Sequence, residues 1–188
     1  MTMVDSQQQG RLPVERIVSG GQTGVDEGAL RAAIELGLEH GGWCPRGRRN
    51  ERGRIASCFV LRETATSNYA ERTRLNVRDA DATLILHRGP LRGGTRLTLD
   101  CARELGKPWW TLDLERAPLD LESVRKWLHA HSVRVLNVAG PRESSCPGIA
   151  EAARRIVLAL IGGPSIEVDR ADRMEGEASV GGEGGPIG

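Results

Sequence analysis

The chain has 188 residues, which is long enough for one domain with a sizeable core and too short for two ordinary domains. Hydrophobic residues make up 39% of it and charged residues 27%, a composition typical of globular rather than disordered proteins. Its 26 basic and 25 acidic side chains leave a net charge of +1, so we do not expect nucleic-acid binding through overall charge.

We expect a cytoplasmic protein, because the sequence shows no membrane-spanning segment, no export signal and no disulfide pattern. No apolar run approaches the roughly 20 residues needed to cross a bilayer, and the polar, Gln-rich residues 1–10 contain no apolar segment for export. The cysteines Cys44, Cys58, Cys101 and Cys146 are far apart and show no CxxC spacing. We therefore expect reduced thiols, no thiolate-bound metal, no membrane association and no cofactor required for folding.

Short β-rich runs alternate with helical patterns along the chain. Helices are predicted over 26–36, 68–78, 95–105, 119–130 and 147–161, the last with the clearest i, i+3, i+4 spacing of apolar residues. The predicted buried strands are RIVS at 16–19, ATLILH at 82–87, WWTLDL at 109–114 and VRVLNV at 133–138. This alternation implies βαβ crossovers. It predicts a single-domain, doubly wound α/β fold whose mostly parallel sheet carries helices on both faces.

Composition sets the expected domain boundaries. Residues 162–188 are rich in glycine and acids and hold almost no apolar side chains, so burial cannot offset the entropy of ordering them. Residues 1–13 are similarly polar. We expect a disordered N-terminal arm over 1–13, a ligand-binding domain over 14–161 and a disordered tail over 162–188.

Three glycine-rich turns stand between a predicted strand and the next helix. They are SGGQTGVD at 19–26, GPLRGGT at 89–95 and NVAGPRES at 137–144. In a parallel sheet all three lie at the carboxyl edge, where open α/β sheets bind ligands. Glycines let backbone N–H groups converge, and helix N-termini add a positive dipole end. The three turns together predict a site for phosphate or a similar oxyanion, although any one alone is equally typical of a tight turn.

The candidate ligand-binding residues come from these turns and one neighbouring helix. Thr23 and Thr95 offer hydroxyls, and Arg142 offers a forked donor suited to phosphate. Asp26 and Asn76 are expected to address a ring or ribose, although a first-turn aspartate such as Asp26 is equally typical of dipole compensation. The full set is Gly20, Gly21, Gln22, Thr23, Gly24, Asp26, Asn76, Gly93, Gly94, Thr95, Thr98, Gly140, Arg142, Glu143 and Ser144.

A basic run follows Trp43-Cys44-Pro45. It holds one acid, Glu51, among the arginines Arg46, Arg48, Arg49, Arg52 and Arg54. Such a run is most often a solvated, mobile loop, and the alternative is a lid that folds over the bound anion. Nucleic-acid binding by the run would be strongly salt-dependent, and the run holds almost no aromatic residues for base stacking.

Six segments resemble the motifs of the putative molybdenum carrier family. They are GGQTGVD at 20–26, HGGWCPRG at 40–47, LRET at 61–64, YAERTRLNVRDAD at 69–81, GGTRLTLD at 93–100 and NVAGPRES at 137–144. That family belongs to a Rossmann-like superfamily with the lysine-decarboxylase-like cytokinin-activating hydrolases and the DNA-processing proteins of natural transformation. The resemblance implies a Rossmann-like fold, a site for molybdenum cofactor or a nucleotide, and a homodimer or homotetramer.

Three functions follow as hypotheses. The leading one is a binding or carrier protein, more than an enzyme, for a phosphorylated heterocyclic ligand. The second is hydrolysis of the N-glycosidic bond of a nucleotide. The hydrolase relatives carry PGGxGTxxE, but Thr98 stands here in place of the glutamate, so Asp26, Asp100 or Glu143 would have to replace it. The third is single-stranded nucleic-acid binding through Arg46–Arg54.

Overall fold

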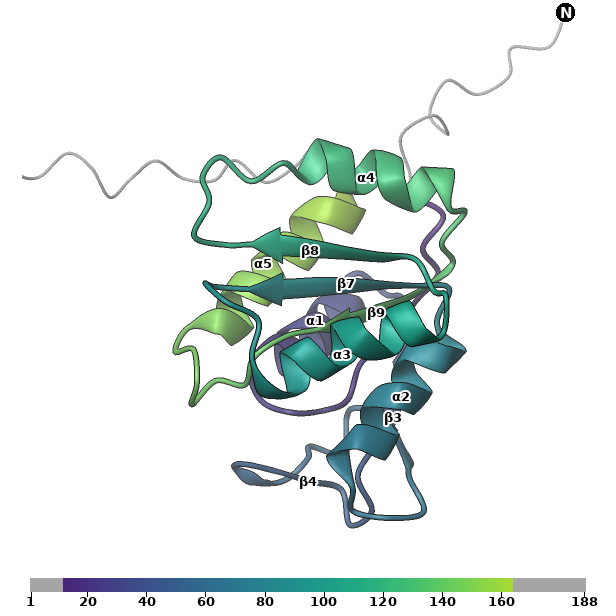
Figure 1. The fold of residues 1–188 in the computed structure, drawn as a ribbon, viewed down its shortest axis with the longest axis vertical. Coiled ribbons are helices and arrows are strands. Elements are labelled where there is room, and N and C mark those ends of the chain that lie inside the picture. The colour runs from purple at the N-terminus through teal and green to yellow at the C-terminus, as the bar shows by residue number, and fades with distance from the viewer. Residues whose placement is uncertain (1–11, 164–188) are drawn as a thin grey trace, which may run out of the picture.

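The computed structural model describes residues 12–163, which form a central sheet covered by helices on both faces (Figure 1). The arm expected over 1–13 and the tail expected over 162–188 lie almost entirely outside the described residues. None of the helices in residues 12–163 is long and apolar enough to cross a membrane.

Five strands, all parallel to their neighbours, form the central sheet in the order β2-β1-β9-β7-β8. Four of them were predicted, and the sequence analysis missed β2, a three-residue edge strand of sequence EHG whose polar residues give no strand signal. The interior strand β7 is buried along five of its six residues, as expected for a parallel strand covered on both faces. The strands are β1 (Arg16–Val18), β2 (Glu39–Gly41), β7 (Ala82–His87), β8 (Trp109–Asp113) and β9 (Val135–Ala139).

All five predicted helices are present, with ends within two residues of their expected positions. The side chain of Asn68, one of the expected caps, accepts a hydrogen bond from the Ala70 N–H at the start of α2. The helices are α1 (Val25–Glu35), α2 (Tyr69–Asp79), α3 (Gly93–Glu104), α4 (Leu121–Ala130) and α5 (Ile149–Gly162).

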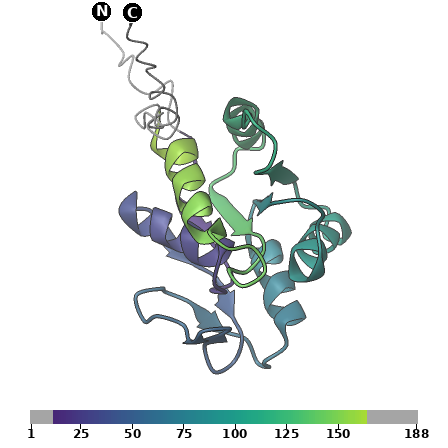
Figure 2. The ribbon, with the colours of Figure 1, turned by 90° about the vertical axis from the view of Figure 1, so that its left-hand side faces the viewer.

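The helices divide between the two faces of the sheet (Figure 2). Residues of α1, α4 and α5 share the main core with the sheet, Leu128 and Leu160 being fully buried in it. On the other face α2 and α3 pack together through Val77, Cys101 and Ala102. This three-layer arrangement is the doubly wound α/β fold that the sequence predicts.

Two small sheets extend the molecule beyond the central one, and in Figure 1 they lie below it. One pairs β3 (Trp43–Cys44) with β6 (Arg62–Glu63), and the other pairs β4 (Arg49–Asn50) with β5 (Gly53–Arg54) as an antiparallel hairpin. Ile55, Phe59 and Leu61 form a small core beneath this β4–β5 hairpin together with Leu30 of α1. The basic run of the sequence is therefore built into an ordered element.

Candidate functional site

The three glycine-rich turns lie side by side because β1, β9 and β7 are adjacent strands in the middle of the sheet. They open on a cleft of about 840 Å³ at the carboxyl edge, a volume suited to a nucleotide-sized ligand. Among the residues lining it are Gln22 and Asp26 of the first turn, 87–95 of the second except Leu91, and 139–142 of the third. Tyr69 and Arg72 of α2, Glu51 of the hairpin and Glu115 complete much of the wall.

The N-terminus of α3 presents unpaired donors to this cleft. Within residues 12–163, the backbone N–H groups of Gly93 and Gly94 have no hydrogen-bond partner, no side chain caps the helix, and its first turn holds no acid. A β-carbon added at either glycine would meet nothing within 4 Å, so neither glycine is packed against protein on its side-chain face. Free N–H groups and the positive dipole end together make an anion-binding position.

The helices that follow the other two glycine-rich turns, α1 and α5, have their N-termini compensated. The Glu143 carboxylate accepts hydrogen bonds from the N–H groups of Gly148, at 2.5 Å, and Ala150, at 3.0 Å, and so caps α5. In α1 the Val25 N–H donates to the Pro141 carbonyl at 3.2 Å, and Asp26 and Glu27 supply acids to the first turn. The N–H groups of Asp26 and Glu27 also lack a hydrogen-bond partner in the described chain, but among these three helix ends only that of α3 has no carboxylate in its first turn or capping it.

A buried ion pair joins the first turn to α2. Arg72 Nη1 lies 3.0 Å from Asp26 Oδ2, and the two side chains are only 13% and 4% exposed. Burial raises the pKa of Asp26, while Arg72 and the N–H of Gln22, at 3.1 Å, act in the opposite direction. A β-carbon at Gly20 would lie 2.2 Å from the guanidinium carbon of Arg72, so only glycine lets this arginine lie across the turn.

Arg72 has a further donor to offer. Its Nε is buried and has no hydrogen-bond partner within residues 12–163, and the residue lines the cleft. A buried donor without a partner costs free energy, and a ligand could satisfy this one only after the Arg72 side chain shifts, because the atom itself is not exposed to the cleft. Arg88, Arg92 and Arg142 bring the arginines of the cleft wall to four, against the carboxylates Asp26, Glu51 and Glu115.

The β4–β5 hairpin is tied to the first and third turns by Glu51. The Glu51 carboxylate accepts hydrogen bonds from the hydroxyls of Thr23 and Ser144 and from the Ser144 N–H, at 3.1 Å, and Arg142 Nε lies 3.4 Å away. Burial raises the pKa of Glu51, but the hydrogen bonds from Ser144 and Thr23 and the charge of Arg142 outweigh it and hold the pKa below its ordinary value.

Further contacts fix the rest of the hairpin. Asn50 Nδ2 donates to the Gly21 carbonyl at 3.2 Å, so the hairpin covers the first turn. Arg48 donates to the carbonyls of Leu61, at 2.9 Å, and Phe59, at 3.0 Å, and Arg52 pairs with Glu27 at 3.2 Å. Two of the five arginines expected in the basic run therefore stabilise the hairpin itself.

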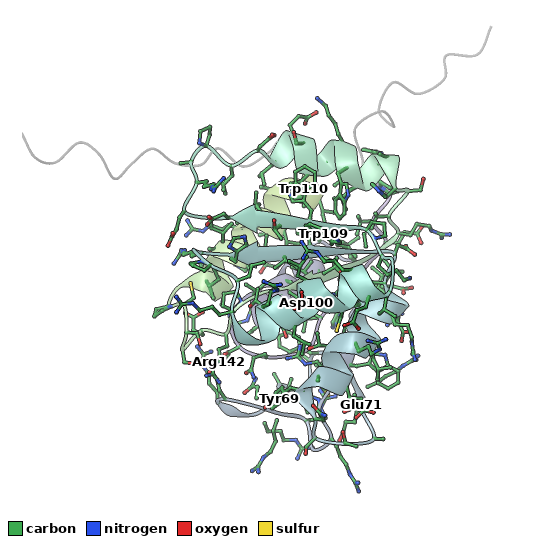
Figure 3. The ribbon with its side chains drawn as sticks, in the orientation of Figure 1. Tyr69, Glu71, Asp100, Trp109, Trp110 and Arg142 are labelled. Atoms are coloured by element: carbon green, nitrogen blue, oxygen red, sulfur yellow. The ribbon has the colours of Figure 1, made fainter. Side chains whose placement is uncertain are left out.

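Several residues expected at the site have structural contacts instead. Asn76 is buried and does not line the cleft. Its side-chain amide accepts a hydrogen bond from the Trp43 N–H at 2.8 Å and donates one to the Trp43 carbonyl at 3.0 Å. Asp100 pairs with Arg96 at 3.0 Å and lies partway along α3, well separated from Arg142 in Figure 3. Thr98 lines the cleft, but its hydroxyl donates to the Gly94 carbonyl at 2.9 Å.

The remaining expected residues divide between the cleft wall and the turns behind it. Gly140 lines the cleft together with Gly93, Gly94, Thr95 and Arg142. The other turn residues pack against protein: a β-carbon at Gly21 would lie 2.5 Å from the Leu61 side chain, and one at Gly24 would lie 2.4 Å from the Pro141 carbonyl. Both glycines have positive φ, 71° and 77°, which other residues rarely adopt.

The sequence analysis missed several residues of the wall. Arg72 precedes Asn76 by four residues, and this spacing places both on one face of α2. Glu115 follows a predicted strand at the carboxyl edge, and this position indicates a place near the cleft as it does for the glycine-rich turns. Tyr69 is 48% exposed, and its ring centroid lies 5.9 Å from Arg72 Cζ. No sequence pattern marked Tyr69 as part of the site.

The fold defines a Rossmann-like protein, with a candidate ligand-binding cleft at the carboxyl edge of its sheet. Residues 17–161 match the model of the circularly permutated YpsA SLOG family, and the chain belongs to this family. It is also similar to the "putative molybdenum carrier protein" of Syntrophus aciditrophicus SB, whose crystal structure is known. The two chains are 39% identical with a TM-score of 0.75, and the match covers 80% of this chain and 96% of that one. No match was found among curated proteins. The family resemblance and the Rossmann-like α/β fold expected from the sequence are confirmed.

Proposed function

We propose that this protein binds and carries a phosphorylated small molecule with a heterocyclic ring, such as molybdenum cofactor or a nucleotide. The observation that carries the proposal is the uncapped N-terminus of α3, which opens on the nucleotide-sized cleft. The name of the similar crystal structure, that of a molybdenum carrier, supports a molybdenum-containing ligand.

The phosphate end of the ligand would lie on α3. The N–H groups of Gly93 and Gly94 and the hydroxyl of Thr95 supply donors, and Arg92 and Arg142 bring positive charge to the same wall. These groups are fixed before binding, so little conformational entropy is lost on contact. Arginine forks and helix N-terminal amides are the donors that proteins commonly use for phosphate.

The ring end would lie toward Asp26, Arg72 and Tyr69. The Asp26 carboxyl offers an acceptor to the polar edge of a pterin or purine, the guanidinium of Arg72 supplies positive charge, and Tyr69 offers an aromatic face. The donors present thus fit a ligand that joins a phosphate ester to a planar, polar ring. Molybdenum cofactor and a nucleotide both meet this description.

Native mass spectrometry of freshly purified protein tests the proposal. We expect a population heavier than the chain by the mass of a phosphorylated, ring-bearing ligand, and the same spectrum checks the dimer or tetramer that the family resemblance implies. Calorimetric titration of the ligand-free protein with adenosine monophosphate, and with adenosine as control, gives a second test. The proposal would be contradicted if no ligand co-purified with the protein and the ligand-free protein did not bind adenosine monophosphate.

A second function, hydrolysis of a nucleotide N-glycosidic bond, is favoured by one observation. Asp26 is the only one of the three candidate acids that lines the cleft, and burial raises its pKa, as is common for a general acid. Asp100 is paired with Arg96, and Glu143 caps α5. Release of free base from nucleoside monophosphates, abolished by Asp26→Asn, would establish the enzyme, whereas intact nucleotide after prolonged incubation supports the carrier.

A further inference from the structure

We propose that Glu51 occupies a second oxyanion site, formed by Thr23, Ser144 and Arg142, and that an incoming tetrahedral oxyanion displaces it and releases the β4–β5 hairpin. The internal carboxylate would then act as a latch that the ligand opens. The inference rests on the proposed function in that an anionic ligand enters this cleft, and the two sites share only Arg142.

The donors around Glu51 are the kind that bind an external anion. One carboxylate oxygen receives the Thr23 hydroxyl and the Ser144 N–H, and the other receives the Ser144 hydroxyl and lies 3.4 Å from Arg142 Nε. Two hydroxyls, a backbone N–H and a guanidinium from two different turns thus converge on one pair of oxygens. Phosphate and related oxyanions present the same acceptor atoms with more charge, so the set suits them at least as well.

The position of Glu51 makes it replaceable. It belongs to the connection between β4 and β5, each only two residues long. Release of the hairpin must also break the hydrogen bonds from the Glu51 N–H to Gln22 Oε1, at 3.1 Å, and from Asn50 Nδ2 to the Gly21 carbonyl, at 3.2 Å. Glu51 and Arg142 line the cleft, whereas Thr23 and Ser144 lie behind them and contact the carboxylate. Removal of the Glu51 side chain would expose both hydroxyls to the cleft.

The charge of the hairpin supports displacement by an anion. Arg46, Arg49 and Arg54 are exposed beside Glu51, and their positive potential attracts anions to this side of the cleft. A ligand with two anionic groups could occupy both the α3 site and the Glu51 site, whereas a single oxyanion would compete with Glu51 directly. The second site therefore takes either a second charged end of the carried ligand or a free oxyanion.

Calorimetric titration with inorganic phosphate tests the latch. We expect Glu51→Ala to bind phosphate at least tenfold more tightly than the wild type, and Glu51→Gln, which keeps the size of the side chain, to bind it more tightly by a smaller factor. The matched control is Glu63→Ala, because Glu63 accepts a hydrogen bond from the Gly47 N–H at 2.7 Å in the same segment but has no contact with the three donors. We expect Glu63→Ala to leave phosphate affinity unchanged.

Two further measurements complete the test. On the Glu51→Ala background, Thr23→Val and Ser144→Ala should each remove most of the gain, and in the wild type phosphate should speed tryptic cleavage after Arg49, Arg52 or Arg54. Adenosine diphosphate gaining more than inorganic phosphate from Glu51→Ala would assign the site to a second charged end of the ligand, and an equal gain would assign it to a free oxyanion.

Unchanged or weaker phosphate binding in both Glu51 variants would overturn the proposal and leave Glu51 as an anchor of the hairpin. The result is distinguishable from a failure of the α3 site, because Thr23 and Ser144 belong to the Glu51 site alone, whereas Arg142 is shared.

Discussion

The N-termini of α3 and α5 follow similar turns, but they differ in whether the chain supplies a carboxylate to their N–H groups. Each helix begins after a glycine-containing turn at the carboxyl edge of the sheet, and each turn includes an arginine that lines the cleft. At α5 the carboxylate of Glu143 accepts hydrogen bonds from the N–H groups of Gly148 and Ala150, whereas at α3 the N–H groups of Gly93 and Gly94 have no partner within residues 12–163. A glycine-rich turn before a helix is therefore not enough to make an anion site. The donors must also lack a partner from the chain itself.

The largest effect is expected where α1 meets α2. Arg72→Met leaves the buried carboxylate of Asp26 without its partner, which should reduce the free energy of unfolding by about 3 kcal/mol at pH 7. Arg72 opposes the rise that burial causes in the Asp26 pKa, so the variant's folded-state pKa is higher still. Because a raised carboxyl pKa costs stability as the pH rises, the deficit should shrink on acidification. Urea denaturation at pH 7 and pH 5 measures it.

The control for this prediction is the double variant Asp26→Asn/Arg72→Met, which removes both charges and should recover part of the lost stability. A deficit of equal size at the two pH values would show that the loss reflects packing of the Arg72 stem and not its charge.

The next largest effect is expected from a substitution that gives the N-terminus of α3 an acid, as the N-termini of α1 and α5 already have. Gly94 has room for a side chain, so Gly94→Asp adds an acid at the N-terminus without steric conflict. We expect phosphate and nucleotide affinity to fall more than tenfold, while the fold gains a few tenths of a kcal/mol from the helix dipole. Gly94→Asn has nearly the same shape without the charge and should retain most of the affinity. Equal losses in the two variants, measured by calorimetry, would show that bulk and not charge blocks the site.

A moderate effect is expected at the closed end of α5. Glu143→Gln replaces a carboxylate that accepts from two backbone N–H groups, and the loss should be about 1 kcal/mol of unfolding free energy. Phosphate affinity should change less than twofold, because the carboxylate serves the helix and not the cleft. Thermal melting and calorimetry on one preparation check both statements, and a large loss of affinity with unchanged stability would contradict the role assigned to Glu143.

The smallest effect is expected at Asp100. Its ion pair with Arg96 is half-exposed and joins residues i and i+4 of one helix, so Asp100→Asn should change stability by less than about 0.5 kcal/mol. Neither ligand binding nor any release of free base should change. A clear loss of binding would place Asp100 at the site and reopen its role as a replacement for the missing glutamate.

Features carried by local periodicity were predictable from the sequence. The buried strand β7 follows from a short continuous run of mostly apolar residues, and the amphipathic helix α5 from apolar residues at spacings of three to four. The meeting of the three turns followed from the parallel topology that this alternation implies. The edge strand β2 was not predictable, because its pairing with β1 and not its own side chains makes it a strand.

Features that depend on contacts distant in sequence were not predictable. Glu51 lies 93 residues before Ser144, and nothing near either residue indicates that the carboxylate would lie among the donors of two turns. Arg72 and Asp26 are likewise 46 residues apart. Glycine and threonine spacing thus marked where a cleft would form, whereas the partners that close or leave open each donor are decided by tertiary packing.

The most direct test of the open α3 end is a titration of the isotope-labelled protein with inorganic phosphate, followed by amide chemical shifts in nuclear magnetic resonance spectra. The account predicts that the largest shifts fall on the N–H groups of Gly93 and Gly94, with the capped N–H groups of Gly148 and Ala150 nearly unmoved. Shifts concentrated at the start of α5, or no shift at Gly93 and Gly94 at saturating phosphate, would contradict it.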